Sequence, residues 1–114
     1  MLPRKKRLSL GREFVRIRQK GKTYDSTSFG LVVNYGQDDG PKAAFIVSKK
    51  IDRRSVVRHA VKRKLAEVIT PFFPRLKKNT ELVFLAKQKV ITVGKQELSL
   101  EIESILKRIR VAGS

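Results

Sequence analysis

The sequence predicts one α+β domain in which a small mixed sheet packs against helices as an α/β sandwich. Apolar residues recur at helical spacing in three segments, short apolar runs typical of strands form three others, and turn residues separate them. A chain of 114 residues forms one compact domain and is hardly long enough for two. We therefore expect residues 1–114 to fold as a single domain, in the order helix, strand, strand, helix, strand, helix.

The amino-terminal part predicts a basic arm and a first helix. Residues 1–8 are rich in lysine and arginine and are expected to be extended. In residues 11–20, Phe14 and Ile17 are three positions apart, so a helix places both on one face. Gly21 directly after this segment is typical of the end of a helix. Packing in the core is one role for Phe14, and contact with a ligand is the alternative.

Two strands are expected next. Apolar side chains alternate in residues 29–35, and a second apolar run covers residues 43–47. Residues 36–41, Gly-Gln-Asp-Asp-Gly-Pro, indicate a turn between them. We therefore expect the two strands to form a hairpin, and we interpret Asp38 and Asp39 as turn residues rather than as a metal site.

The second half of the chain predicts a helix, a strand and a helix. Residues 54–69 have helical spacing, and their apolar residues fall in one arc: Val57, Val61, Leu65 and Val68. The adjoining arc is basic and contains Arg58, Lys62, His59 and Arg63. Pro71 and Pro74 end this helix. A strand over residues 81–87 and an amphipathic helix over residues 95–110 follow.

The net charge indicates the class of partner. The chain has 27 Lys and Arg residues against 10 Asp and Glu, a formal charge of +17. These charges repel one another in the compact state, and a polyanion that releases counterions on binding relieves the repulsion. Nucleic acid is the commonest such partner, and an anionic membrane lacks support because no exposed apolar face is predicted. Without cysteine, a secretory signal or a membrane span, the expected location is the cytoplasm.

Much of this charge is concentrated in residues 47–65, which predict a strand end, a short basic loop and a helix. Arg54, Arg58 and Lys62 are spaced by four, so they stack along one flank of the helix and can follow a run of phosphates. No acidic residue stands among them. We therefore interpret the flank as a contact surface for RNA or DNA rather than as a solvated helix face.

No catalytic residue, metal ligand or protein-bound cofactor is predicted. The sequence contains no pair of carboxylates with metal-site spacing and no nucleophile placed beside a base. His59 is the one histidine, too few for a histidine metal cluster, and we do not expect it to act as a titrating catalyst. The chemistry of any reaction is therefore expected to come from a partner.

Residues 47–65 resemble the signature helix of the bacterial ribonuclease P protein subunit. That pattern is close to a lysine pair, an arginine pair and then Arg-Asn-Arg-Ile-Lys-Arg. The matching positions are Lys49, Lys50, Arg53, Arg54, Arg58, Val61, Lys62 and Arg63. His59 replaces the asparagine and Ala60 the second arginine. His59 can still donate a hydrogen bond, whereas Ala60 cannot.

The resemblance extends over nearly the whole chain in the same order. Residues 2–8 are similar to the family's opening, and residues 44–50 to its strand before the lysine pair. Phe14, Ile17 and Gly21 resemble its first helix. Residues 81–87 resemble its last strand, with Glu81 where aspartate is more usual.

The resemblance implies that this chain is the protein subunit of an RNA enzyme. In that family a large catalytic RNA, using Mg²⁺ ions bound to it, cleaves precursor tRNA to free the mature 5′ end, and the protein holds the 5′ leader. The implied contacts with the catalytic RNA are Arg53, Arg54, Arg58, His59, Lys62, Arg63 and Lys64. The candidate leader-binding residues are Phe14, Arg18, Lys49 and Lys50. The implied fold is shared with some ribosomal proteins and contains a left-handed βαβ crossover, against the usual handedness.

Three alternatives remain open at this point. A structural ribosomal protein is also small, basic and without cysteine, and it would bind ribosomal RNA with no role in cleavage. A DNA-binding regulator is disfavoured because strands, not a helix-turn-helix partner, precede the 54–69 helix. A protein ribonuclease acting alone would cut precursor tRNA without any RNA subunit. The expected partners are the catalytic RNA and precursor tRNA, with neither DNA nor membrane.

Overall fold

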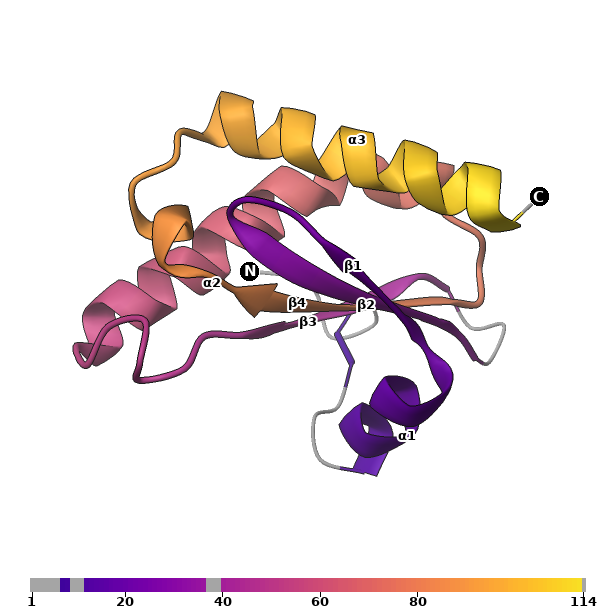
Figure 1. The fold of residues 1–114 in the computed structure, drawn as a ribbon, viewed down its shortest axis with the longest axis horizontal. Coiled ribbons are helices and arrows are strands. Elements are labelled where there is room, and N and C mark those ends of the chain that lie inside the picture. Colours follow the sequence, from indigo (N-terminus) through magenta and orange to yellow (C-terminus); the bar gives the residue numbers. More distant parts are fainter. Residues whose placement is uncertain (1–6, 9–11, 37–39, 114) are drawn as a thin grey trace.

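The computed structural model describes residues 7–8, 12–36 and 40–113, with only the backbone described at 12–14 and 110–113 (Figure 1). The elements are α1 (Arg12–Lys20), β1 (Lys22–Asp25), β2 (Phe29–Tyr35), β3 (Lys42–Ile46), α2 (Ser55–Ile69), the 3₁₀ helix η2 (Thr70–Arg75), β4 (Thr80–Ala86), the 3₁₀ helix η3 (Gln88–Ile91) and α3 (Lys95–Gly113). The three predicted helices and the three predicted strands are all confirmed. Of the predicted amino-terminal arm, residues 1–6 lie outside the described part of the chain.

The sheet has four strands in the order β1-β2-β4-β3. β2 pairs antiparallel with both β1 and β4, while β3 and β4 are parallel. A parallel pair needs a crossover, and α2 lies in the connection from β3 to β4. This is the βαβ unit that the resemblance implies, and its left-handed sense stays a prediction.

Two details of the strand prediction were wrong. The predicted hairpin of residues 29–35 with 43–47 does not form, because β4 lies between β2 and β3. As an inner strand, β4 has Leu82, Val83 and Phe84 all buried, so both of its faces are covered. The hairpin partner of β2 is instead β1, which sequence patterning missed because Lys22–Asp25 has one large apolar residue and no alternation.

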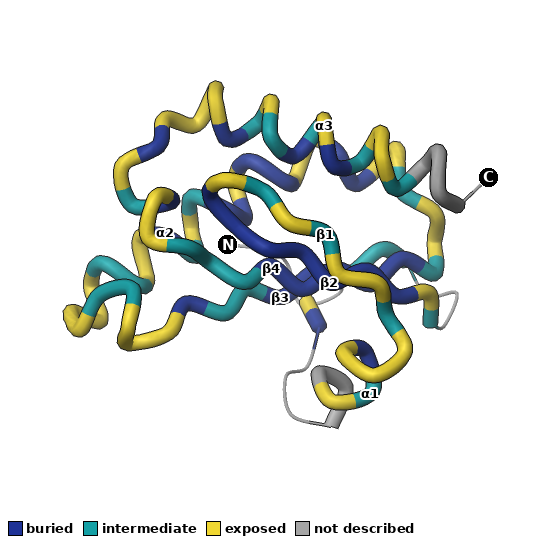
Figure 2. The backbone as a smooth tube through the Cα atoms, in the orientation of Figure 1, coloured by how far each residue is buried: buried dark blue, intermediate teal, exposed yellow. Residues whose placement is uncertain are grey.

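The larger core lies between the sheet and the pair α2 and α3, on one face of the sheet (Figure 1). Phe29 and Phe84 are fully buried in this layer, with ring centroids 5.2 Å apart. From the helices, Leu65, Leu98 and Ile102 pack against them. The outer surface of α3 stays exposed (Figure 2). Among the described residues, none of the helices combines the length and the apolar character that crossing a bilayer requires.

A smaller apolar cluster covers one end of the opposite face. Ile17 of α1 and Leu8 of the amino-terminal segment pack there against Val32, Ala44 and Val83. The backbone N–H of Leu8 donates to the carbonyl oxygen of Ala43 at 3.0 Å, so this segment is tied to β3. The sheet is therefore covered by two helices on one face and by one short helix on the other.

Candidate RNA interface

Helix α2 is held on the sheet by one apolar face, and this decides where its cations point. The buried residues of the helix are Val61, Leu65, Ala66, Val68 and Ile69. Arg58 and Lys62 lie half-buried beside this face, while His59 and Arg63 are exposed. We call Arg58, His59, Lys62 and Arg63 the basic ridge. Because the opposite face of α2 is packed in the core, the ridge has a fixed position on the fold.

The outer part of the basic ridge carries uncompensated charge. Within the part of the chain that the structure describes, Lys62 and Arg63 form no ion pair. The next acid along the helix, Glu67, is paired with Lys95 of α3, with 2.6 Å between Oε2 and Nζ. Fixed cations without counter-charges produce a positive potential that attracts a polyanion.

The loop before α2 is held by Asp52. The carboxylate accepts hydrogen bonds from Arg54 Nε at 3.1 Å, Arg54 Nη2 at 3.0 Å and the Arg54 backbone N–H at 2.8 Å. The Arg54 bonds lower the pKa of Asp52 to about 2, so the carboxylate stays ionised at neutral pH. Arg54 remains exposed, but part of its charge is balanced by Asp52.

Arg58 joins the loop to the basic ridge. Its Nη1 donates to the carbonyl oxygens of Asp52 at 3.1 Å and Arg53 at 2.7 Å. One nitrogen of the guanidinium is thus used to fix the loop that carries Arg53, an exposed residue. Arg58 therefore has a structural role in addition to the RNA contact that the sequence predicts.

Lys64 does not belong to the basic ridge, which corrects its predicted grouping with Lys62 and Arg63. A helix turns by about 100° per residue, so Lys62 and Lys64 point about 160° apart. The Lys64 ammonium donates to three carbonyl oxygens around η3: Val90 at 2.9 Å, Val93 at 2.7 Å and Ile91 at 3.4 Å. Burial, and secondly Lys95, lower its pKa. The Lys64 ammonium is therefore engaged within the fold, and its contact with RNA stays a prediction.

Replacing Lys64 by methionine should destabilise the protein by about 2 kcal/mol, because methionine fills similar space but cannot donate to the carbonyl oxygens. The matched control is Lys62→Met in the same helix, which removes an ammonium from the basic ridge and should cost less than about 0.5 kcal/mol. Urea unfolding measures both variants. Equal stability of the two would show that the bonds from Lys64 contribute nothing.

The four candidate leader-binding residues are not gathered at one place. Arg18 is exposed on α1, whereas Lys49 and Lys50 are exposed in the loop after β3, at the other end of the sheet (Figure 1). The side chain of Phe14 lies outside the described residues, so its two alternatives stay predictions. Between the two ends, Ile46 and Leu85 are half-buried on the face that α1 covers only in part. Arg18, Lys49 and Lys50 thus border a strip of sheet that the described residues leave open.

The sequence did not predict that Glu81 positions α1. Glu81, buried on β4, accepts hydrogen bonds from Arg16 Nη2 at 3.0 Å, Arg16 Nη1 at 3.3 Å and Asn34 Nδ2 at 2.9 Å. The forked pair with Arg16 joins α1 to the sheet. The available signal was an acidic residue at the start of an otherwise apolar strand, because a carboxylate that is buried there needs a partner.

Carboxylates and the histidine do not converge anywhere in the described residues. No group of three or more His, Cys, Asp or Glu side chains within residues 7–8, 12–36 and 40–113 is placed to hold a metal ion. Asp38 and Asp39, predicted to be turn residues, lie outside the described part of the chain. The described residues therefore provide positive surface and apolar surface, the two features that bind a polynucleotide.

Comparison with known proteins identifies a matching family. The family model described as Ribonuclease P matches residues 2–110 of this chain. The ribonuclease P protein component of Finegoldia magna is 35% identical over 82 residues, which are 72% of this chain and 71% of that protein. The component of Clostridium novyi is 33% identical over 98 residues, 84% of this chain and 86% of that protein.

Solved structures agree in fold. The ribonuclease P protein of Staphylococcus aureus superimposes with a TM-score of 0.79 at 20% identity, over 93% of this chain and 96% of that one. The protein from Thermotoga maritima gives a TM-score of 0.79 at 22% identity, over 90% of this chain and 96% of that one. At these identities the structural likeness shows a common fold.

Proposed function

Because the chain belongs to the ribonuclease P protein family, we propose that it binds the catalytic RNA of ribonuclease P and the 5′ leader of precursor tRNA. In this role it assists the endonucleolytic removal of the leader that gives the mature 5′ end of tRNA. Hydrolysis itself is carried by the RNA and its Mg²⁺ ions, and the protein contributes binding and positioning.

The observation that carries the RNA contact is the basic ridge on α2. Lys62 and Arg63 are held on a helix whose other face is buried in the core, and no described acid neutralises them. When such cations replace counterions along a phosphate chain, the released ions drive binding. His59 adds a hydrogen-bond donor between them, and Arg53 extends the charge into the loop. Arg54 and Arg58 act both on RNA and on the loop itself.

The leader occupies the open strip of sheet between α1 and the loop after β3. Half-buried Ile46 and Leu85 offer apolar surface to unstacked bases, while Arg18, Lys49 and Lys50 attract the phosphates on either side. Phe14 is the candidate for stacking. Two RNAs repel each other through their phosphates, and a cationic protein placed between them reduces that repulsion. This is why a binding protein assists a reaction performed by RNA.

Reconstitution tests this proposal. The purified protein, combined with a candidate ribonuclease P RNA, should increase 5′ trimming of precursor tRNA at a low Mg²⁺ concentration where the RNA alone is weakly active. The protein without RNA should not cleave. Cleavage by the protein alone would show that the protein itself catalyses the hydrolysis. Recovery of ribosomal RNA in place of a single large catalytic RNA, when the protein is purified from its cells, would favour the ribosomal alternative.

A further inference from the structure

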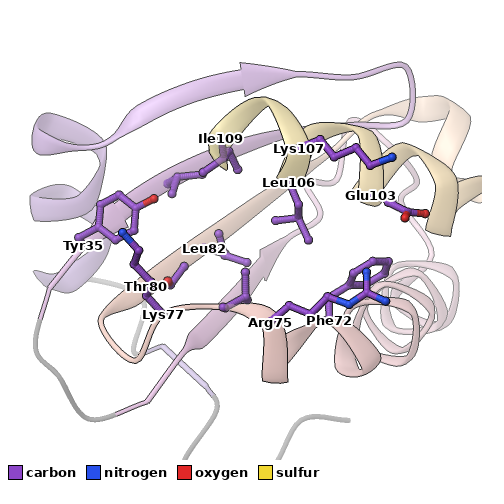
Figure 3. Close-up of a pocket in the computed structure, with 12 residues that line it drawn as sticks. Tyr35, Phe72, Arg75, Lys77, Thr80, Leu82, Glu103, Leu106, Lys107 and Ile109 are labelled. Atoms are coloured by element: carbon purple, nitrogen blue, oxygen red, sulfur yellow. The ribbon is translucent and has the colours of Figure 1, made fainter. Parts of the chain in front are cut away.

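A hollow opens on the α3 side of the sheet, at the end opposite the loop after β3 (Figure 3). Its volume is about 240 Å³. Val33 and Leu82 of the sheet form its floor, and Leu106 and Ile109 of α3 form one wall. Leu98, Ile102 and Ile105 of α3 are fully covered, but Leu106 and Ile109 are half-buried. The apolar stripe of α3 therefore continues beyond the core into an open site.

Cations surround the mouth of this hollow. Arg75 and Lys77 follow α2 in the chain, Lys107 comes from α3, and all three are exposed. Glu103 is the single acid among the lining residues. Neither Lys77 nor Lys107 forms an ion pair with any residue the structure describes. The mouth thus carries an excess of positive charge over an apolar floor.

Aromatic rings lie at both ends of the hollow. The guanidinium of Arg75 lies over the ring of Phe72, 5.4 Å from its centroid. At the other end stands Tyr35, whose side chain is visible in Figure 3 and whose relative exposure is 47%. Burial, and secondly Tyr24, raise the pKa of the Tyr35 hydroxyl, which therefore keeps its proton and can donate a hydrogen bond. An exposed ring beside lysines is a stacking platform for a base.

A second hollow, of about 150 Å³, adjoins the first. Both are lined by Val33, Tyr35 and Ile109, so Tyr35 stands at their common boundary. The second hollow adds two further exposed cations, Lys20 and Lys22. Cations therefore border both hollows, with an exposed aromatic ring between them.

We propose that these two hollows form a second binding site for single-stranded RNA, in which a base stacks on Tyr35 and the neighbouring phosphates contact Lys77, Lys107 and Lys22. The site is separate from the basic ridge on α2 and from the sheet face beside α1. Duplex RNA does not fit it, because a base reaches an apolar hollow only when it is unstacked. The excess of cations favours a polyanion over an apolar protein segment. This site does not depend on the proposed role in ribonuclease P.

The absence of tryptophan from the chain makes a local test possible. Tyr35→Trp places a fluorescent ring in the site, and Leu100→Trp places one at an exposed position of α3 outside it. A short oligouridylate, titrated at low salt, should quench the first variant to saturation and leave the second nearly unchanged. In the Tyr35→Trp protein, Lys77→Glu with Lys107→Glu should raise the half-saturating concentration about tenfold. Lys78→Glu with Lys89→Glu changes the net charge by the same amount outside the hollows. This control pair should raise the half-saturating concentration less.

Three results of these titrations would overturn the proposal. The first is equal quenching at positions 35 and 100, and the second is equal effects of the two charge-reversed pairs. The third is competition by inorganic polyphosphate, which has no bases, as effective as that by oligouridylate. Sedimentation of the Tyr35→Trp protein without RNA completes the test: a monomer is expected, and self-association that buries position 35 would make the hollows an interface between copies. None of these results bears on the trimming assay, so the two proposals fail or succeed separately.

Discussion

A protein with Lys62→Glu and Arg63→Glu should bind the catalytic RNA about 100-fold more weakly than the unchanged protein at physiological salt. Two cations of the basic ridge are removed and two anions take their place, so phosphates that were attracted are repelled. The slope of log affinity against log salt should become shallower by about two units, because about two fewer counterions are released. Filter binding over a range of salt concentrations measures both quantities.

The control for this variant is Lys78→Glu with Lys89→Glu, which lowers the net charge by the same amount outside the basic ridge. A general loss of charge would weaken RNA binding equally in both proteins, whereas the basic ridge predicts a much larger effect at positions 62 and 63. The free energy of unfolding should be nearly unchanged in both, because neither pair contributes to the core. An unchanged salt slope for the α2 variant would mean that its cations are only solvated.

Much of the fold followed from local pattern. The amphipathic spacing of α2 predicted both its buried face and its basic flank, because one periodicity sets both. The strand pairing did not follow, because β2 and β4 are both buried on both faces and local pattern does not decide which strand lies between which. In the structure β4 separates β2 from β3. β1 is held by its pairing with β2 and has little pattern of its own.

Of the candidate binding residues, too, some were predictable from local pattern and others were not. The exposed cations of α2 were predictable because a helix packed on one side must present its other side to solvent. The role of Lys64 was not, because the carbonyl oxygens that bind it belong to η3 and the turn after it, far along the chain. The hollows beside Tyr35 were also invisible in the sequence, since they are formed where α1, β2, η2 and α3 end near one another. Such sites depend on tertiary contacts and not on spacing.

Replacing Glu81 by alanine should destabilise the protein by about 2 kcal/mol and release α1 from the sheet. The carboxylate accepts from Asn34, which is buried, and from Arg16, whose side chain is 38% exposed. Without Glu81, Asn34 loses its buried acceptor, while water can replace the partner of Arg16 in part. The space around the carboxylate is tight, because a Cβ added to Gly36 would lie 2.6 Å from Glu81 Oε1.

The loss of stability in Glu81→Ala can be separated from a general effect of removing an acidic residue. Glu103→Ala removes a half-buried acid that forms no ion pair with a described residue, and it should cost less than about 0.5 kcal/mol. Glu81→Gln keeps an acceptor for Asn34 but loses the charge that pairs with Arg16. Its loss of stability should therefore fall between those of Glu81→Ala and Glu103→Ala. Urea unfolding ranks the variants, and hydrogen exchange of the α1 amides should accelerate most in Glu81→Ala. If α1 exchanges at the same rate in all three proteins, the ion pair does not hold the helix. The border of the proposed leader site would then depend on other contacts of α1, among them the apolar contacts of Ile17.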